Sequence, residues 1–276
     1  MAKLFQFSPY ESNTSDIRRR LNSVRLSILR MHYKSQTSHV ASSLSCADII
    51  YHLCLEKKLR DHNQYQSGIE IVFSKGHAAS AFYASLAEIG ELGFSDLDSY
   101  CTDGSHLYGH ISHLAHPWIN LSTGSLGHGL PFGLGLTIAN RISGSQTITS
   151  VLMSDGEINE GTTWECALIA SALNLNSLIC FIDANGLQSL DFVENVLPLE
   201  PLTDKWRAFG WNVHEIDGHD ETLFESIELH ELKPTVVILR TVKGKGVSFM
   251  ENDLAWHYKS PTDDNLKNAI SELMSE

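Results

Sequence analysis

Two strongly apolar runs, separated by one amphipathic segment, constrain the fold of this chain more than any other feature. Residues 146–153 and 177–183 predict buried β-strands, and residues 162–173 between them predict a helix. The positions of that helix expected to face the core are Trp164, Leu168, Ile169 and Leu173. A strand–helix–strand unit of this kind favours parallel strands, which end at the same edge of the sheet.

A polar residue follows each of these two strands. Asp155 comes directly after the first strand, and Asn185 follows the second. We expect both side chains at the carboxyl edge of the sheet, where α/β proteins bind ligands. Carboxylate and amide oxygens suit Mg²⁺, which commonly binds one or two protein side chains together with phosphates. The spacing therefore predicts a metal-held diphosphate, although Asp155-Gly156 and Asn185-Gly186 are also ordinary turn-forming dipeptides.

The other periodic segments extend the same pattern. Helices are predicted over residues 15–31, 45–59, 78–89, 126–141 and 221–232, and strands over residues 69–73, 211–216 and 235–239. Ser45 and Asp48 have the spacing of a capping box at the start of the second helix. Residues 105–122 predict a long loop rich in His and Gly, and such loops often carry function. The alternation predicts an α/β fold with a doubly wound, mainly parallel sheet flanked by helices.

Composition narrows the class of protein. The formal net charge of −13 disfavours binding to nucleic acid or to anionic lipid, and no segment is long and apolar enough to span a membrane. No linker-like tract divides the chain, so we expect one domain over residues 1–276 with a helical lead-in at about residues 1–60. The five cysteines lack paired spacing, and the amino terminus lacks a signal sequence. Both features favour a cytoplasmic protein.

Several segments together resemble a known family. Ser154-Asp155-Gly156, followed by Asn185, resembles the thiamine diphosphate motif, in which the first position is usually glycine. Four flanking segments resemble the amino-terminal half of transketolases, and they are residues 73–79, 121–129, 198–211 and 233–250. The resemblance covers about residues 38–261 and is closest to transketolases that are split into two polypeptides. It implies a thiamine diphosphate-binding fold.

The resemblance also implies a set of site residues. The metal, Mg²⁺ or another divalent cation such as Ca²⁺ or Mn²⁺, would be bound by Asp155, Asn185 and the backbone carbonyl of Leu187. The implied cofactor-binding residues are His77, Gly124, Leu126, Asp155, Gly156, Glu157, Asn185 and Leu187. His39 and His110 would be catalytic, because histidines at these positions line the donor pocket and can transfer protons near neutral pH. His77 also begins a predicted helix, where an anion is favoured.

Five positions depart from the family pattern. Ser154 replaces a glycine, His128 replaces a common glutamine, and Ser189 stands where an isoleucine packs against the cofactor. The residues around His39 and His110 also differ, which leaves donor specificity open. For His128, as for His113 and His116 in the long loop, a polar loop or cap position is the competing explanation.

The resemblance implies an activity and a partner. Transketolases move a two-carbon ketol unit from a ketose or ketose phosphate to an aldose through thiamine diphosphate, which serves as the electron sink. The carboxy-terminal, pyrimidine-binding subunit would be a separate chain in a hetero-oligomer, and Glu160 is a candidate contact residue. The alternatives are an acyloin-forming transferase of a biosynthetic pathway, the cofactor-binding chain of a 2-oxoacid decarboxylase or dehydrogenase, and a non-catalytic partner-binding subunit.

Overall fold

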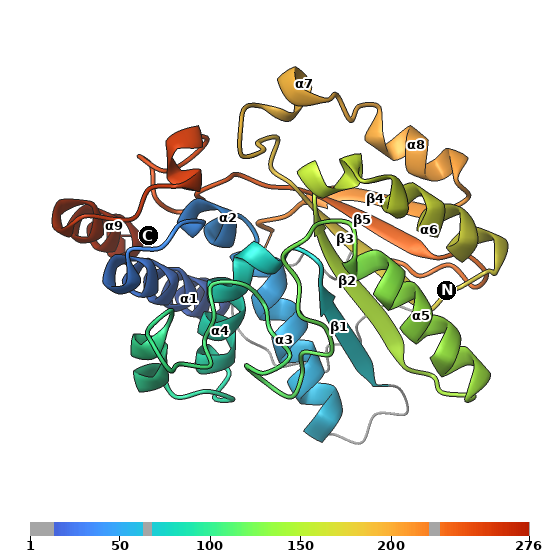
Figure 1. Cartoon of the computed structure of the whole chain (residues 1–276), viewed down its shortest axis with the longest axis horizontal. Helices are drawn as coiled ribbons and strands as arrows, with labels where there is room; N and C mark the ends of the chain where they lie inside the picture. The colour runs from blue at the N-terminus through green and yellow to red at the C-terminus, as the bar shows by residue number, and fades with distance from the viewer. Residues whose placement is uncertain (1–13, 63–67, 221–226, 276) are drawn as a thin grey trace.

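Five parallel strands form one sheet in the order β1-β2-β3-β5-β4 within the described part of the chain (Figure 1). The structure is a computed structural model that describes residues 14–62, 68–220 and 227–275. The strands are β1 (Ile69–Phe73), β2 (Ile148–Ser154), β3 (Leu178–Ala184), β4 (Asn212–Asp217) and β5 (Thr235–Arg240). All five predicted strands are present, and every neighbouring pair runs parallel.

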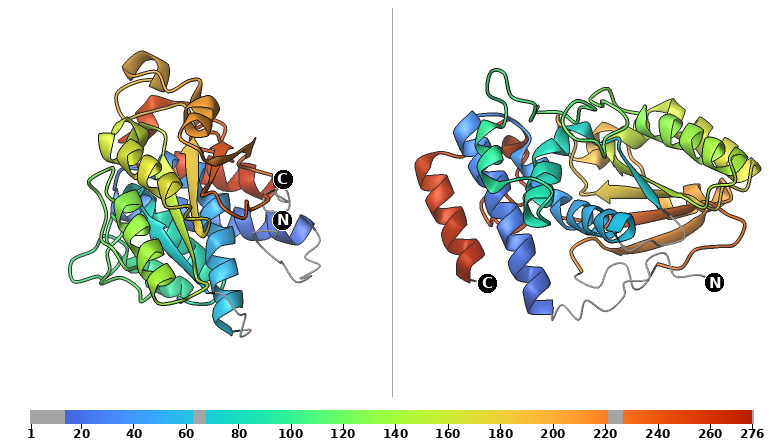
Figure 2. Two further views of the ribbon diagram at one scale, coloured as in Figure 1. Left: turned by 90° about the vertical axis from the view of Figure 1, so that its right-hand side faces the viewer. Right: turned by 90° about the horizontal axis from the view of Figure 1, so that it is seen from below.

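Helices cover both faces of the sheet because successive strand residues point to opposite sides. In β2, Leu152 packs into one core cluster while Val151 and Met153 pack into the other. The first cluster contains residues of α1 (Thr14–Ser35), α2 (Val40–Ser45), α3 (Ala47–His62) and α4 (Ala79–Glu88). The second contains residues of α5 (Gly129–Ile142), α6 (Gly161–Ala172) and α8 (Leu202–Ala208). This arrangement confirms the predicted doubly wound α/β fold (Figure 2).

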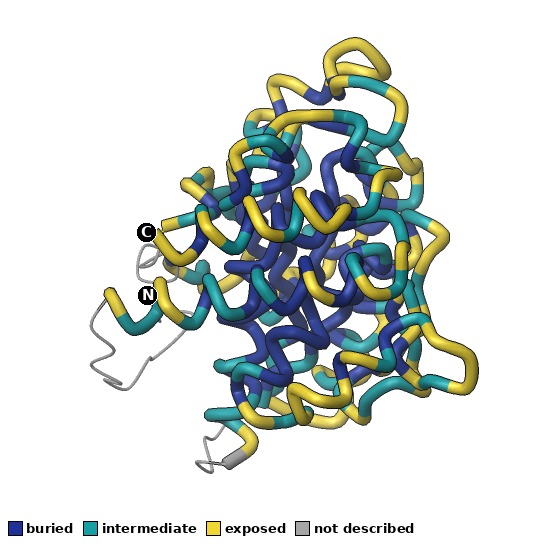
Figure 3. Tube along the Cα trace, turned by 90° about the vertical axis from the view of Figure 1, so that its left-hand side faces the viewer, coloured by how far each residue is buried: buried dark blue, intermediate teal, exposed yellow. Residues whose placement is uncertain are grey.

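Shorter elements complete the chain. They are the 3₁₀ turns η1 (Gly76–Ala78), η2 (Phe94–Ser99), η3 (Gly156–Asn159) and η5 (Leu254–His257), and the helices α7 (Val193–Val196) and α9 (Asp263–Ser275). Helix α9 packs beside α1 (Figure 1). Buried backbone lies at the centre of the molecule and exposed turns lie around it (Figure 3). None of the helices in the described ranges combines the length and apolar character needed to cross a bilayer.

Of the four residues predicted to face the core from α6, Trp164 packs against the second cluster, but the prediction is wrong for the other three. Leu168, Ile169 and Leu173 are 57%, 45% and 43% exposed. The buried residues of the helix are Thr163, Cys166, Ala167 and Ala170. Apolar residues occupy both sides of this helix, so periodicity alone did not distinguish them. Of these smaller side chains, Cys166, Ala167 and Ala170 belong to the second core cluster.

Two further expectations about helices need correction. Ser45 does not cap α3, because it ends α2 and its hydroxyl donates to Asp183, while α3 begins at Ala47. Asp48 instead accepts hydrogen bonds from Arg25 and His219. The helix predicted over residues 221–232 is not present in residues 227–232, and residues 221–226 lie outside the described part. The helices α2, α7, α8 and α9 were not predicted.

Candidate functional site

A cavity of about 230 Å³ opens at the carboxyl edge of the sheet. Lys75 and His77 follow β1, Asp155 follows β2, Asn185 follows β3 and Lys243 follows β5, so parallel strands bring them together. The lining residues are His39, Ser42, Lys75, His77, His110, Gly124, Leu126, Ser154, Asp155, Gly156, Asn185, Leu187, Gln188, Ser189, Lys243 and His257. Every residue predicted for the site therefore lines this cavity, with the exception of Glu157.

Asp155 and Asn185 are fixed by the same tight turn after β3. One carboxylate oxygen of Asp155 accepts the Gly186 N–H at 2.7 Å, and Oδ1 of Asn185 accepts the Leu187 N–H at 3.0 Å. Asp155 is only 4% exposed. Burial, reinforced by the nearby Asp183 carboxylate, raises the pKa of Asp155 to about 6. A divalent cation beside this carboxylate would compensate the buried negative charge.

Glu157 lies behind the cavity wall rather than in it. Its fully buried carboxylate accepts hydrogen bonds from the Ser74 hydroxyl, from Gly127 N–H at 2.9 Å and from Ser154 N–H at 3.3 Å. These bonds join the segments that follow β1 and β2 to the loop containing Gly124 and Leu126. The structure therefore assigns Glu157 to bracing the walls, because it is hydrogen bonded to three wall segments and does not face the ligand space.

Four histidines gather on one side of the cavity. The ring centroid of His39 lies 5.3 Å from that of His77, 5.6 Å from that of His110 and 5.0 Å from that of His257. Burial lowers the pKa of all four histidines, to about 4 for His39 and to about 3 for His257. The positive charges of Lys75 and Lys243 lower the pKa of His39 and of His257 further. At neutral pH these imidazoles are uncharged, so each ring has one donor and one acceptor nitrogen.

The backbone at His39 is held in an unusual conformation. Its φ of +78° lies in the left-handed region, which is uncommon for residues other than glycine. The His39 N–H donates to the His257 carbonyl at 3.0 Å, which ties the segment before α2 to η5. Strained backbone of this kind is often found where a side chain is aimed at a ligand.

Two lysines and one histidine in the cavity were missed by the sequence analysis. Lys243 is 2% exposed, and its ammonium group donates to the carbonyls of Leu187 and Gln188 at 3.2 Å and lies 3.2 Å from Nδ1 of His257. Burial, together with the positive charge of Lys75, lowers the pKa of Lys243 to about 8. Lys75 is 1% exposed and pairs with Asp183. Lys75 and Lys243 lie in segments already noted for the family resemblance, whereas no local pattern singles out His257.

The donor set fits a hard divalent cation and a diphosphate. Asp155, Asn185 and the Leu187 carbonyl offer only oxygen atoms, which Mg²⁺, Ca²⁺ and Mn²⁺ prefer. Among the described residues no group of three or more His, Cys, Asp or Glu side chains has the geometry of a metal site. Gln188 Nε2 is a buried donor without a partner in the described chain, and Gln188 lines the cavity. An anionic ligand would satisfy that donor.

Only some of the positions that depart from the family pattern line the cavity. Ser154 and Ser189 line the cavity, so both substitutions change its wall. His128 is exposed and precedes α5 without forming a side-chain cap. His113 is hydrogen bonded to Ser122, and neither His113 nor His116 is among the residues that line the cavity.

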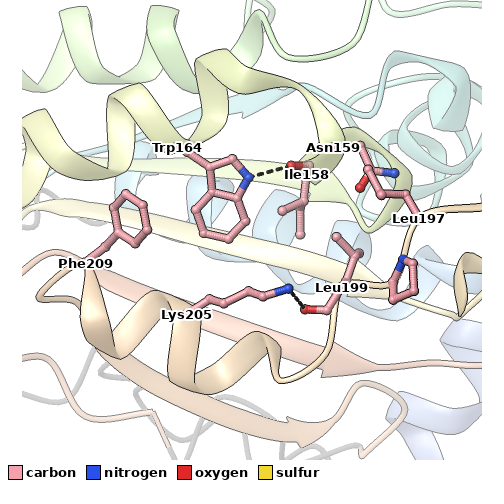
Figure 4. A pocket seen from close by; sticks show the side chains of 8 residues that line it. Ile158, Asn159, Trp164, Leu197, Leu199, Lys205 and Phe209 are labelled. Atoms are coloured by element: carbon pink, nitrogen blue, oxygen red, sulfur yellow. Dashed lines mark hydrogen bonds between the residues drawn. The ribbon is translucent and has the colours of Figure 1, made fainter.

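A larger cavity of about 320 Å³ lies between α6 and α8 but has a different character (Figure 4). Trp164 and Phe209 form its walls with ring centroids 5.2 Å apart. Lys205 is the charged residue of its lining, and its ammonium group donates to the Leu199 carbonyl at 2.7 Å (Figure 4). This lining has no carboxylate or imidazole group, whereas the histidine-rich cavity combines both, so the histidine-rich cavity is the candidate active site.

Comparisons with known proteins find relatives that match nearly the whole chain. Residues 17–274 match the family model described as "Transketolase, thiamine diphosphate binding domain". One of the subunits of an apulose-4-phosphate transketolase from Actinobacillus succinogenes is 38% identical over 98% of this chain and 100% of its own length. One of the subunits of a 6-deoxy-6-sulfo-D-fructose transketolase from a Clostridium species is 36% identical over 95% of this chain and 97% of its own length.

Solved transketolase structures share the fold. A Pichia stipitis transketolase in complex with sedoheptulose-7-phosphate aligns with a TM-score of 0.83 and 24% identity, over 94% of this chain and 40% of that enzyme. A Campylobacter jejuni transketolase aligns with a TM-score of 0.82 and 22% identity, over 94% of this chain and 42% of that enzyme. The chain therefore spans less than half the length of these enzymes, and at these identities the likeness concerns the fold alone.

Proposed function

This chain belongs to the transketolase family through its thiamine diphosphate-binding domain, and from that premise we propose that it is the amino-terminal subunit of a two-chain transketolase. It is a transferase subunit for ketol units. The single observation that supports the site assignment best is the meeting of Asp155, Asn185 and the Leu187 carbonyl in one histidine-rich cavity at the carboxyl edge of the sheet. The family match and the named relatives favour this function over an acyloin-forming biosynthetic transferase, the cofactor-binding chain of a 2-oxoacid decarboxylase or dehydrogenase, and a non-catalytic subunit.

We propose that the metal and the diphosphate bind side by side in this cavity. Asp155, Asn185 and the Leu187 carbonyl would bind Mg²⁺, while His77, Gln188 and the loop at Gly124 and Leu126 would contact the diphosphate. Lys243 would add positive charge, because its buried ammonium group lies at the same wall. Gly76 allows the backbone before His77 to lie close to the backbone at Thr123, next to Gly124. A Cβ at residue 76 would lie 2.8 Å from the Thr123 carbonyl oxygen.

Thiamine diphosphate, when bound, supplies the electron sink that allows the carbon–carbon bond beside a ketose carbonyl to break. We propose that His39, His110 and His257 hydrogen bond the hydroxyl and carbonyl groups of the ketose. Their neutral rings can accept a proton from one hydroxyl and donate to another oxygen. The relatives act, by their names, on apulose-4-phosphate and 6-deoxy-6-sulfo-D-fructose, so we propose a ketose that carries a terminal anionic group as donor.

A second chain is part of this proposal. Two relatives of matching length are named as subunits, and the chain spans about 40% of the solved transketolases. The partner would be a carboxy-terminal, pyrimidine-binding subunit that completes the active site in a hetero-oligomer. We also propose that the pair acts in the cytoplasm and that residues 1–276 form one domain. Glu160 stays a candidate for the contact between subunits.

His110→Ala tests the catalytic side of the proposal. In the reconstituted pair the wild-type chain is expected to transfer a ketol unit from a ketose phosphate or ketose sulfonate to an aldose, measured with a coupled assay. The variant is expected to lower kcat by about 100-fold, in the range of general acid–base catalysis, and to change cofactor affinity by less than about threefold. His113→Ala, at an exposed loop position outside the cavity, is the matched control. Equal losses of kcat and cofactor affinity would show that His110 is structural.

A further inference from the structure

Asp183 is a fully buried hydrogen-bond centre beneath the candidate metal site. It is the last but one residue of β3 and is 0% exposed. One carboxylate oxygen accepts from the Ser45 hydroxyl at 2.5 Å, from Asn185 Nδ2 at 3.1 Å and from the Lys75 ammonium group. The other oxygen accepts from the Thr241 hydroxyl. Four segments of the chain therefore converge on a single carboxylate.

This centre does not face the ligand. Asp183, Ser45 and Thr241 are absent from the residues that line the cavity, whereas Asn185 lines it. A buried ion pair such as Lys75–Asp183 stabilises a fold weakly, because desolvating both charges offsets their attraction. A contribution to folding is therefore a weak explanation for placing these charges here, and the position of the Asn185 amide offers a stronger one.

The hydrogen bonds fix which way the Asn185 amide points. Its nitrogen donates to both Asp183 Oδ2 and Ser45 Oγ, the latter at 3.0 Å. Its oxygen accepts the Leu187 N–H, and Asn185 is one of the residues that line the cavity. An ionised carboxylate can only accept, so the amide nitrogen is the group that Asp183 selects. The amide oxygen, which is the atom a metal needs, is then the end of the carboxamide that Asp183 and Ser45 leave free for a ligand.

We propose that Asp183 is a positioning residue that orients the Asn185 carboxamide for the divalent cation, and that Ser45 is its helper. Lys75 completes the arrangement by balancing the charge of Asp183 while also donating to the Ser42 carbonyl at 2.8 Å. The inference rests on the proposed function, because it takes Asn185 as a metal ligand. Neither Asp183 nor Ser45 needs to touch the metal or the cofactor for this role.

The test measures binding of Mn²⁺ by electron paramagnetic resonance in the full chain with its partner subunit and thiamine diphosphate. Asp183→Asn leaves a single acceptor oxygen at this position and removes the charge that pairs with Lys75, and it is expected to weaken Mn²⁺ binding by about 10- to 100-fold, as changes behind metal ligands commonly do. Ser45→Ala keeps the Lys75–Asp183 pair and removes one acceptor of the Asn185 amide. It is expected to weaken binding by about 10-fold. Ser45→Ala also keeps the test decisive if Asp183→Asn does not fold.

Thr241→Val is the matched control. It removes a hydrogen bond to the oxygen of Asp183 that does not contact Asn185. Its Mn²⁺ affinity is expected to stay within about twofold of wild type, even if its thermal midpoint falls. The inference is overturned if wild type binds Mn²⁺ and a folded Ser45→Ala protein binds it as tightly as Thr241→Val. Failure of wild type itself to bind Mn²⁺ would instead contradict the proposed function and, with it, this inference.

Discussion

Asp155→Asn will weaken the Mg²⁺-dependent binding of thiamine diphosphate by at least about 100-fold, because even changes behind a metal ligand cost about 10- to 100-fold. The substitution keeps the size of the side chain and removes the negative charge that faces the cation. Asparagine also cannot accept the Gly156 and Gly186 N–H groups with two oxygens, as the carboxylate does. The loop that contains the other proposed ligands is therefore loosened at the same time.

Isothermal titration calorimetry of the assembled protein checks this expectation, with Mg²⁺ held in excess. Asp204→Asn is a suitable control, because Asp204 is an exposed residue of α8 that pairs with Arg207. Circular dichroism would establish that both variants are folded. Tight cofactor binding by folded Asp155→Asn would remove Asp155 from the metal site.

Gly129→Ala will destabilise the protein by about 3 kcal/mol, at the upper end of the usual cost of overpacking. A Cβ at residue 129 would lie 2.2 Å from the Cβ and Oγ of Ser74 and 2.6 Å from its Cα. The backbone that follows β1 would have to move, since no flexible side chain can yield. Ser74 also donates to Glu157 and accepts the Gly129 N–H at 2.9 Å, so the cavity wall would be disturbed as well.

Gly135→Ala in the same helix is the matched control. Its Cβ would have no atom within 4 Å, and residue 135 is exposed. Alanine there is expected to stabilise the helix by up to about 1 kcal/mol, because glycine is a poor helix former. Urea unfolding monitored by circular dichroism distinguishes the two variants. Equal stabilities of Gly129→Ala and Gly135→Ala would contradict the close packing of α5 on Ser74.

The sequence predicted the sheet and its ligand-binding edge because those features depend on local signals. Buried parallel strands are continuous apolar runs, and each ends where a polar residue follows, as at Asp155 and Asn185. Strand direction then follows from the connecting helix. Asp155 and Asn185 could therefore be predicted from the sequence, whereas Lys75 and Lys243, which also follow strands, were not singled out.

Features that depend on long-range contacts could not be predicted from the sequence. His257 reaches the cavity from a 3₁₀ turn near the carboxyl end, and nothing in its neighbourhood distinguishes it from the other histidines. Ser45 matched a local capping pattern, yet its hydroxyl is used by Asp183, far away in the sequence. The orientation of α6 could not be predicted either, because its two faces have similar apolar character and tertiary packing decides which of them is buried.

Thermal unfolding of the wild-type chain tests the central claim most directly. It would be measured with and without thiamine diphosphate plus Mg²⁺, for the chain alone and for its complex with the carboxy-terminal subunit. A ligand stabilises only the state that binds it, so the complex is expected to unfold at a higher temperature when both ligands are present, and to lose that shift when EDTA removes the metal. An unchanged thermal midpoint in a demonstrably formed complex would contradict the assignment of this chain as the diphosphate- and metal-binding half of a transketolase.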